Sequence, residues 1–580
     1  MAAGPPSLQF HFATADEELE ELQVAHDLNA ITATRLVPLP QPEHGHAFLG
    51  APAALGKHVC FHYRRLYLGF HVELLFNRDL WIHNKYPFPR SSTGQPPEQR
   101  AATPLYQQLY EGLRNTILTG QLKAGWRLPS TRALATDLGI SRATVQLAFE
   151  QLIAEGYLEG RSGSGTYVSA ALPTEGFLST AVQTNRTQLL TQDRAISQRA
   201  SVIMTSPYIG PPLRIPGKSW PRAFRVGQPA YDAFPHKTWE SLLVRSWRRM
   251  PQDLLTYHRV AGYLPLREAI AEYLATARGV RCTARQVIIV CGSQQGIDLT
   301  ARVLLDPGER VWIEDPGYTG ARGAFLAAGA RLVPVPLDAE GMVVDLGKAR
   351  DPDARIAFVT PSHQFPMGMT MSLVRRISLL EWARTAGAWI LEDDYDSEFR
   401  YVGRPLAALQ GLDTTDRVIY LGTFSKVLFP ALRLGYLVVP PDLVSAFVRA
   451  QLFTTVHLPL LEQIALAAFL SEGHFTRHIR RMRQLYHERQ ELLLEGARQE
   501  LTGLLDVQPD PAGMHLIGWL PHNRDDRQIT YAAASAGVDV MPISHYCLET
   551  HERPGILLGY TAVGGEEMKA GVRSLARVLV

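Results

Sequence analysis

The chain has 580 residues, a length that predicts three or four structural units rather than one domain. Hydrophobic residues make up 46% and charged residues 20% of the sequence, as in globular proteins with a large core, and the formal net charge of +2 points neither toward nor away from nucleic acid. The four cysteines are scattered and form no CxxC pair, which speaks against a disulfide framework and a structural zinc site. The sequence has no long uncharged apolar run, which speaks against a membrane span, and no signal-peptide pattern. We therefore expect a cytoplasmic protein.

Residues 1–99 form an N-terminal extension that we expect to be poorly ordered. An acidic run lies between Asp16 and Glu21, a Pro/His-rich stretch follows, and no helical or strand periodicity persists before residue 72. A linker rich in Pro, Ser, Gly and Gln then reaches residue 99. A small accessory element and a start site placed too far upstream are the alternatives for the first 71 residues.

Residues 100–170 carry the pattern of three short helices and a hairpin. "TPLYQQLYEGLRNTILTG" repeats apolar residues on one helical face, which predicts the first helix. We expect the second helix between Ser130 and Gly139 and the third between Ser141 and Gly156, because Ser favours helix starts and Gly helix ends. "YLEGRSGSGTYVS" predicts a β-hairpin. This order is typical of a winged helix-turn-helix domain.

The residues of this unit that we expect to contact DNA carry short or fork-shaped hydrogen-bonding groups. They are Arg132, Ser141, Arg142, Thr144, Gln146 and Arg161. For any one arginine, a solvated polar face is the alternative. The text from "PLYQQLYEG" to "GRSGSGTYV" resembles the GntR-family DNA-binding domain nearly end to end, and that resemblance implies binding to double-stranded operator DNA.

Residues 171–218 are rich in Ser, Thr, Gln and Pro and predict a long linker, and residues 219–580 follow as a large domain. Helical runs such as "PLREAIAEYLATARG" alternate there with short apolar runs such as "QVIIVCG", "RIAFVTP" and "AWILEDD". Strands that alternate with helices predict an α/β domain with a mainly parallel sheet.

The large domain offers the parts of a pyridoxal-phosphate (PLP) site. Such a site needs a lysine for a Schiff base, an acid for the pyridine nitrogen, a phosphate cradle and an aromatic face. "GTFSKVLFPALRLGY" places Lys426 beside hydroxyl groups and an arginine, and "WILEDDYDSEF" ends a strand with Asp393, Asp394 and Tyr395. Either carboxylate suits the ring nitrogen, and the phenol suits the ring 3-oxygen.

Two further motifs complete this set. "VIIVCGSQQGIDL" predicts a strand, a turn and a helix start, where backbone N–H groups and Ser293 can face a phosphate, and "IEDPGYTGA" offers Tyr318 for stacking. Each motif alone has a simpler explanation: an ordinary turn, a solvated or calcium-binding acidic loop, or a surface lysine. Their occurrence together and in this order favours the PLP site.

Residues 220–580 resemble fold-type I aminotransferases, and most closely the aminotransferase-like domain of MocR/GabR-type regulators. The matching text includes "GYLPLREAIAEYL", "EDPGY", "EDDYDSEFRY" and "TFSKVLFPALRLGY". The resemblance implies a PLP-dependent transferase fold with a smaller C-terminal α+β subdomain, a homodimer, Lys426 as the Schiff-base lysine, Asp393 at the ring nitrogen and Tyr395 at the 3-oxygen. It also implies cofactor contacts from Ser293, Gln294, Tyr318, Thr423, Ser425, Arg433 and, across the dimer interface, Tyr257.

The chain departs from the aminotransferase pattern in two places. Where aminotransferases carry Asn before Pro, "SHQFPMG" offers His363 or Gln364 to the ring oxygen instead. Where they carry the arginine that binds a substrate carboxylate, "GILLGYT" has Leu557, with Arg553 as a substitute in the preceding loop. The loss of this pair would weaken amino-acid binding and leave PLP binding unchanged.

The sequence thus predicts a PLP-dependent transcriptional regulator that senses PLP, an amino acid or an amine and has no membrane partner. A ligand changes operator affinity only through its differential affinity for two states of the protein. The alternative is an active aminotransferase with a vestigial DNA-binding head, so residual transaminase activity stays open. A PLP-storage protein is a third hypothesis, which the "SRATV" helix disfavours.

Overall fold

The structure is a computed structural model that describes residues 103–172, 196–204, 206, 221–403, 406–549 and 553–580. The predicted poorly ordered extension over 1–99 lies outside the described residues. The chain divides after Asp193 into two compact units, and each is described by itself.

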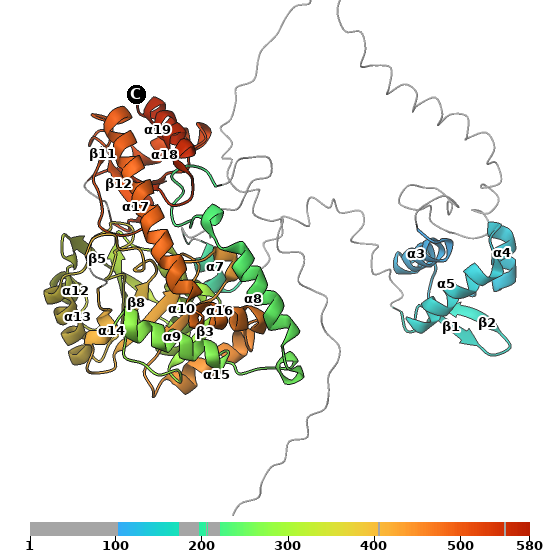
Figure 1. Cartoon of the computed structure of the whole chain (residues 1–580). Coiled ribbons are helices and arrows are strands. Elements are labelled where there is room, and N and C mark those ends of the chain that lie inside the picture. The colour runs from blue at the N-terminus through green and yellow to red at the C-terminus, as the bar shows by residue number, and fades with distance from the viewer. Residues whose placement is uncertain (1–102, 173–195, 205, 207–220, 404–405, 550–552) are drawn as a thin grey trace, which may run out of the picture. The chain divides into compact units, whose positions relative to one another are not determined.

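The described residues of the first unit form three helices and a hairpin (Figure 1). Its elements are α3 (Leu105–Leu118), α4 (Thr131–Leu138), α5 (Arg142–Ala154), β1 (Leu158–Arg161) and β2 (Gly165–Val168). The two strands pair antiparallel. This is the predicted element order of a winged helix.

The predicted helix caps explain where α4 and α5 begin and end. The Oγ atoms of Ser130 and Ser141 each accept a hydrogen bond from a backbone N–H three residues on, at 3.2 and 3.0 Å. Gly139 adopts a φ of 66°, the left-handed conformation that ends α4. The short turn between the two caps fixes how α5 follows α4, and the apolar faces of the three helices meet in one core with residues of the hairpin.

The second unit contains an eight-stranded sheet of the order β3-β10-β9-β8-β7-β4-β5-β6. Strands β9, β8, β7, β4 and β5 are parallel to one another, whereas β10 runs antiparallel to both β3 and β9, and β6 runs antiparallel to β5. The strand bounds are β3 (Val287–Val290), β4 (Arg310–Asp315), β5 (Arg331–Asp338), β6 (Gly341–Met342), β7 (Ile356–Val359), β8 (Trp389–Asp394), β9 (Val418–Thr423) and β10 (Gly435–Val438). The predicted mainly parallel sheet is confirmed.

Helices cover both faces of this sheet. Alternate residues of β3 enter two different cores, Val287 and Ile289 one and Ile288 and Val290 the other, because successive side chains of a strand point to opposite faces. The helices of this part are α8 (His236–Arg248), α9 (Leu264–Ala277), α10 (Gly292–Leu304), α11 (Thr319–Ala327), α12 (Val344–Arg350), α13 (Leu373–Ala386), α14 (Leu409–Leu412), α15 (Val444–Thr455) and α16 (Leu460–Ser471).

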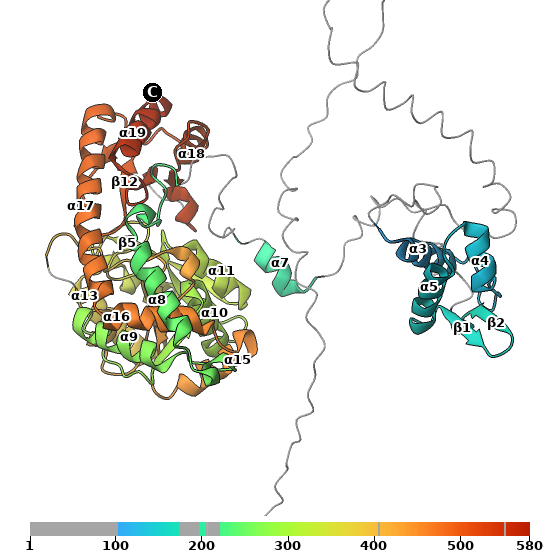
Figure 2. The ribbon, with the colours of Figure 1, turned by 45° about the vertical axis from the view of Figure 1, so that its right-hand side comes forward.

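A smaller C-terminal subdomain follows the 27-residue helix α17 (His474–Glu500), which runs toward it from the part with the large sheet (Figure 2). A four-stranded antiparallel sheet of the order β11-β12-β14-β13 packs there with two helices. The elements are β11 (Asp506–Val507), β12 (His515–Trp519), α18 (Asp526–Ser535), β13 (Met541–Pro542), β14 (Gly555–Gly559) and α19 (Gly565–Leu579). This agrees with the predicted α+β subdomain.

Part of the predicted linker is helical. Helix α7 (Gln198–Met204) lies within the stretch 171–218 and packs against α11 of the second unit. Its weak apolar periodicity gave no signal for a helix. The contact with α11 supplies the partner surface that a helix of seven residues lacks on its own.

Within the described ranges, no helix has the length and apolar character needed to cross a membrane. The same residues contain no group of three or more His, Cys, Asp or Glu side chains that could hold a metal ion. Cys282, Cys291 and Cys547 are free thiols.

Candidate functional site

Most of the predicted cofactor residues of the second unit lie at or just beyond the carboxyl ends of four strands of the large sheet. Strands β4, β8 and β9 run parallel, and β3 runs the same way because β10, its neighbour, is antiparallel to both β3 and β9. Their carboxyl ends therefore meet at one edge of the sheet, where ligands bind in α/β proteins. The residues that follow these strands there include Ser293, Tyr318, Tyr395 and Lys426.

Lys426 lies largely buried at this edge. Its Nζ donates a hydrogen bond to the backbone oxygen of Gly227 at 3.0 Å. A Cβ at Gly227 would lie 2.6 Å from that Nζ, and the φ of 71° at this position also favours glycine. Burial lowers the pKa of Lys426, while Asp396 and Asp393 act in the opposite direction. A lowered pKa makes the neutral, nucleophilic form of the amine more accessible.

The two adjacent carboxylates at the end of β8 have different surroundings. Oδ2 of Asp394 accepts hydrogen bonds from Arg278 at 2.8 Å and from Tyr420 at 2.5 Å. Oδ1 of Asp393 is buried and has no hydrogen-bond partner among the described residues. Burial, with the nearby charge of Asp394, raises the pKa of Asp393 to about 8. Oδ1 of Asp394 also lacks a partner, but Arg278 and Tyr420 hold the Asp394 carboxylate through its other oxygen, whereas no described side chain bonds to Asp393. Asp393 is therefore the carboxyl group that remains free for a ligand.

Tyr395 and His363 belong to one buried network. Nδ1 of His363 lies 2.9 Å from the hydroxyl of Tyr395 and 3.0 Å from Oδ2 of Asp396, and its Nε2 lies 3.6 Å from Asp510. Burial alone lowers the pKa of His363, but the two carboxylates outweigh it and raise the pKa to about 10. Sequence reasoning missed Asp396 and Asp510. The acidic motif "EDDYD" pointed to the first, whereas nothing in the sequence linked Asp510 to this site.

Gln364, the alternative to His363, is engaged elsewhere. Its Nε2 donates to Oε2 of Glu314 at 3.1 Å and to the backbone oxygen of Pro316 at 3.0 Å, and its Oε1 accepts from Met367 N. These contacts fix the loop after β7. Of the two residues offered for the ring oxygen, the structure brings only His363 to Tyr395.

The start of α10 and the loop after β9 form a cradle. Gly292 has a φ of 74°, and a Cβ there would lie 3.2 to 3.3 Å from the guanidinium of Arg433. Nη2 of Arg433 donates to the oxygen of Cys291 at 2.7 Å. Gln294 donates to the oxygen of Gly320 at 2.8 Å. Backbone N–H groups at a helix start and a guanidinium together suit a phosphate.

Thr423 and Ser425 lie at the opposite end of the same loop region. The hydroxyl of Thr423 accepts a hydrogen bond from the N–H of Ser425 at 3.2 Å. This contact shapes the turn that leads from β9 to Lys426.

The two predicted aromatic contacts differ in position. The hydroxyl of Tyr318 donates to Oε1 of Gln294 at 3.4 Å, which joins it to the cradle. Tyr257 is 87% exposed, and its ring lies edge-on to that of His457, at 6.1 Å between centroids. The structure therefore does not bring Tyr257 to the cradle within one chain.

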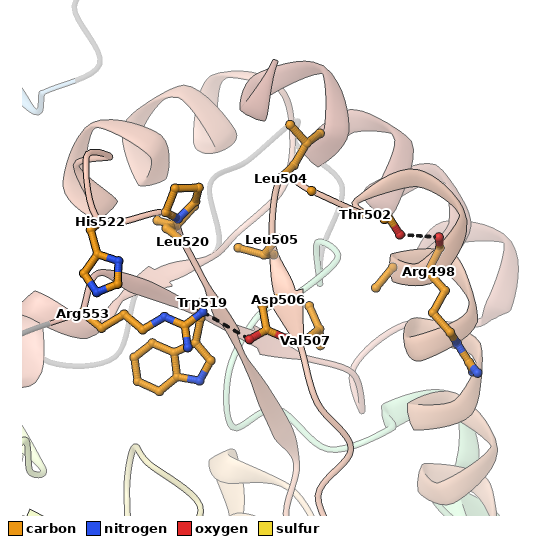
Figure 3. A pocket seen from close by; sticks show the side chains of 13 residues that line it. Arg498, Thr502, Leu504, Leu505, Asp506, Val507, Trp519, Leu520, His522 and Arg553 are labelled. Carbon is orange, nitrogen blue, oxygen red and sulfur yellow. Dashed lines mark hydrogen bonds and ion pairs between the residues drawn. The ribbon is translucent and has the colours of Figure 1, made fainter.

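Arg553 lies away from the cofactor residues, in a pocket of about 400 Å³ in the C-terminal subdomain (Figure 3). Its Nη2 is 3.1 Å from Oδ2 of Asp506, and its guanidinium lies over the ring of Trp519 at 5.1 Å. Leu557 is fully buried against Ile543 and Tyr546. The structure does not bring Arg553 to the site.

In the first unit, four of the predicted DNA-contacting residues lie at the cap or in the first turns of α5, and the other two lie in α4 and in the hairpin. Arg132, Arg142 and Gln146 are exposed, and the side chains of the two arginines have no hydrogen-bond or ion-pair partner among the described residues. The amide of Gln146 donates to Glu150 at 2.9 Å. The hydroxyl of Ser141 caps α5 and also contacts that of Thr144 at 2.8 Å.

Arg161, in the hairpin, is paired within its own strand region. It forms an ion pair with Glu159 at 2.7 Å and lies 4.5 Å from the centre of the Tyr167 ring. These contacts hold an exposed arginine in an extended position on the wing. Of the three arginines predicted to contact DNA, the two without a partner among the described residues therefore lie on α4 and α5, and the paired one lies on the hairpin.

The residues of the second unit fit PLP on three observations. The carboxylate of Asp393 has an unsatisfied buried oxygen, Lys426 is a largely buried amine with a lowered pKa, and Gly292 with Arg433 forms a cradle that a Cβ would obstruct. A pyridine N–H, an aldehyde and a phosphate match these three features in turn.

Two family models match the chain. Residues 105–168 match bacterial regulatory proteins of the gntR family, and residues 224–556 match aminotransferase class I and II. The two matches fall on the first unit and on the second.

Similar proteins include regulators and an enzyme. The chain is 44% identical over 479 residues to the probable rhizopine catabolism regulatory protein MocR of Rhizobium meliloti, which covers 82% of this chain and 94% of that protein. It is 33% identical to the pyridoxine biosynthesis transcriptional regulator PdxR of Corynebacterium glutamicum, over 79% of this chain and 92% of that protein. The solved structure of LysN, an α-aminoadipate aminotransferase from Thermus thermophilus, matches with a TM-score of 0.57 at 30% identity, over 61% of this chain and 91% of that one.

Proposed function

This chain belongs to the MocR-type transcriptional regulators, in which a gntR-family DNA-binding domain is joined to an aminotransferase class I and II domain, and from that membership we propose that it binds PLP at Lys426 and couples its ligand state to operator binding. The observation that carries the proposal is that a largely buried amine, Lys426, and a buried carboxyl group with an unpartnered oxygen, Asp393, lie at the same edge of the sheet in a chain that also has a winged helix.

The DNA-binding part of the proposal rests on the start of α5. Arg142 and Gln146 would reach base edges in the major groove, while Arg132 and Arg161 would contact phosphates on either side. Ser141 and Thr144 would hold the start of α5 near the sugar-phosphate backbone of the DNA. A protein that works on operator DNA also implies a cytoplasmic location.

In the cofactor part, Asp393 would keep the pyridine nitrogen protonated, and Tyr395 with His363 would bind the ring oxygen. The phosphate cradle would consist of Ser293, Gln294, Thr423, Ser425 and Arg433. Bound PLP supplies an aldehyde for covalent attachment and an electron sink. The proposed effector is PLP, an amino acid or an amine.

A homodimer forms part of the proposal, because α8, the segment that follows it and α15 carry large apolar side chains that are highly exposed. Phe453 is 83% exposed, Leu255 and Trp247 are each 62% exposed, and Tyr257 is 87% exposed. An exposed apolar patch of this kind usually marks an interface. Tyr257 would then reach the phosphate of the partner subunit.

An active aminotransferase is the second candidate, and the complete set of Lys426, Asp393 and Arg433 favours it. The buried Leu557, with Arg553 held at Asp506, disfavours it for α-amino acids. The test combines footprinting on the DNA upstream of candidate genes with a transamination assay. A protected segment without turnover supports the regulator, whereas turnover without any protected segment supports the enzyme.

Asp393→Asn is expected to stabilise the cofactor-free protein and weaken its binding of PLP. The folded-state pKa of Asp393 is about 8, against about 3.9 for an unfolded chain. Between these two pKa values the folded protein retains a proton on Asp393 that the unfolded chain releases. The carboxyl group of Asp393 therefore lowers the free energy of unfolding by an amount that is absent below about pH 4 and grows up to about pH 8. We expect a gain in unfolding free energy of about 1–3 kcal/mol near pH 8 and almost none at pH 4. Thermal unfolding at both pH values, without PLP, measures it, and an equal gain at both would contradict this account.

Helix α7 offers a route by which the ligand state reaches the linker. Its Ile203, with Ser206 just beyond it, lines a cavity of about 460 Å³ whose other walls include Gln294 and Arg433 of the cradle. Occupation of the cradle and docking of α7 would therefore influence each other.

Ile203→Asp is expected to reduce the effect of PLP on operator affinity by about 0.5–2 kcal/mol, because a charge on this face opposes docking of α7. Operator titrations with and without PLP measure the effect. Met204→Asp is the matched control, since Met204 is 79% exposed and should leave the response unchanged. Equal responses of both variants would contradict the route through α7.

A further inference from the structure

Helix α17 is basic over its first half and acidic over its second. Between Glu472 and Glu488 the chain has four arginines, three histidines and no acidic residue, whereas four glutamates lie in the stretch from Glu488 to Glu500. The helix runs along the outer edge of the second unit (Figure 2). In a chain whose formal net charge is only +2, positive charge is thus concentrated at one place on the surface.

The exposed residues of the basic half lie on one side of the helix. Arg477, Arg480 and Arg481 are exposed, and so are Gln484 and His487 further along. Residues three or four positions apart in a helix share a side, so these five residues form the basic face of α17. From Arg477 to His487 the helix rises about 15 Å, which corresponds to about four phosphates of one DNA strand.

The arginines of the basic face have no carboxylate partner among the described residues. Arg480 and Arg481 have neither a hydrogen-bond partner nor an ion pair in that part of the chain. Nη2 of Arg477 donates to the backbone oxygen of Glu472 at 3.2 Å. The carboxylate of Glu472 pairs with Arg245 of α8 instead. The basic face therefore offers guanidinium groups whose charge is not compensated by the described side chains.

The opposite side of α17 fixes the helix to the second unit. Phe475, Met482 and Tyr486 are buried in its core. Nε of Arg483 donates a hydrogen bond to the backbone oxygen of Glu398, in the loop after β8. The exposed arginines are thus presented by a firmly packed helix, and their substitution leaves its packing side unchanged.

We infer that the basic face of α17 binds phosphate groups of the operator DNA, in addition to the contacts of the winged helix. The inference rests on the proposed function, because operator DNA is the polyanion that the regulator would bind. Guanidinium groups without an ion pair suit phosphate oxygens, and such contacts add affinity without reading the base sequence. The second unit then takes a direct part in operator binding.

The test substitutes two arginines of the basic face in the full-length protein. We expect Arg480→Ala/Arg481→Ala to weaken operator binding at least about fivefold at low salt, because each phosphate contact releases counterions from the DNA. The slope of log Kd against log salt concentration should fall by about two, since each lost contact removes about 0.9. Binding to DNA of unrelated sequence should weaken by the same factor. Titrations at several salt concentrations measure all three effects.

Two control variants separate the effect of charge from an effect on structure. Arg498→Ala/Arg573→Ala removes two exposed arginines, from the acidic half of α17 and from α19, and should leave Kd and the salt slope nearly unchanged. Arg480→Lys/Arg481→Lys keeps both charges and should keep the salt slope. Every variant should retain the absorbance of bound PLP. A slope that falls equally in either control overturns the inference.

Hydroxyl-radical footprints test the contact directly. The natural protein should protect positions of the DNA backbone that stay open to cleavage in the complex with Arg480→Ala/Arg481→Ala. If α17 only faces solvent, or binds an acidic protein instead of DNA, both proteins give the same footprint and the same salt slope. That result overturns the inference and leaves the regulator proposal standing, whereas a natural protein that protects no DNA contradicts both.

Discussion

Lys426→Ala is expected to give a colourless protein that no longer traps PLP. Lys426 is the largely buried lysine at the carboxyl edge of the large sheet, and Gly227 leaves room for its amine there. Its pKa is lowered by burial, which favours the neutral amine that attacks an aldehyde. Without covalent attachment, only the cradle and Asp393 would hold the cofactor, and we expect affinity for PLP to fall at least about a hundredfold.

Absorbance of the purified protein and mass spectrometry after borohydride reduction measure this loss. Lys237→Ala is the matched control, because Lys237 is an exposed lysine of α8 and should leave the colour and the adduct intact. A borohydride-stable adduct in the Lys426→Ala protein would show that another lysine carries the cofactor.

Arg142→Ala is expected to weaken operator binding by about 1–3 kcal/mol, which is roughly 5- to 150-fold. Arg142 is the first residue of α5, directly after the Ser141 cap. Its side chain is exposed and has no partner among the described residues. Its removal should therefore change the stability of the folded domain little, while it weakens the complex with DNA. The structure thus predicts a change in operator affinity without a change in thermal stability.

Titration of a labelled operator fragment at fixed salt measures this effect, since phosphate contacts make affinity depend on salt. Arg573→Ala, at an exposed position of α19 in the other unit, controls for the loss of one positive charge. Equal affinities for the natural protein and Arg142→Ala on the same operator would rule out the start of α5 as the recognition element.

Local signals accounted for most of the predicted fold. Ser130, Gly139 and Ser141 mark helix ends by contacts within three residues, so the sequence near each end is sufficient to predict it. The order of apolar strands likewise predicted the parallel sheet. Helix α7 was not predicted, because its helical form depends on α11, more than 100 residues further along the chain.

In the candidate PLP site, contacts between residues far apart in the chain were also not predicted from the sequence. The choice between Asp393 and Asp394 depends on Arg278, which lies 116 residues from Asp394 and takes up that carboxylate. Asp510 reaches His363 from the C-terminal part of the chain, and Arg553 is drawn to Asp506 instead of the site. Such pairings are set by tertiary packing, so the spacing of motifs in the sequence does not predict them.

The affinity of the full-length protein for one operator fragment, measured with and without PLP, tests the central claim most directly. A regulator whose ligand site is coupled to its DNA-binding domain should show a change of several-fold in operator Kd when PLP is added, since coupling of about 1–3 kcal/mol is typical. The Lys426→Ala protein should bind the operator with one Kd under both conditions. An operator Kd that is the same with and without PLP in the natural protein, although PLP is bound at Lys426, would contradict the account.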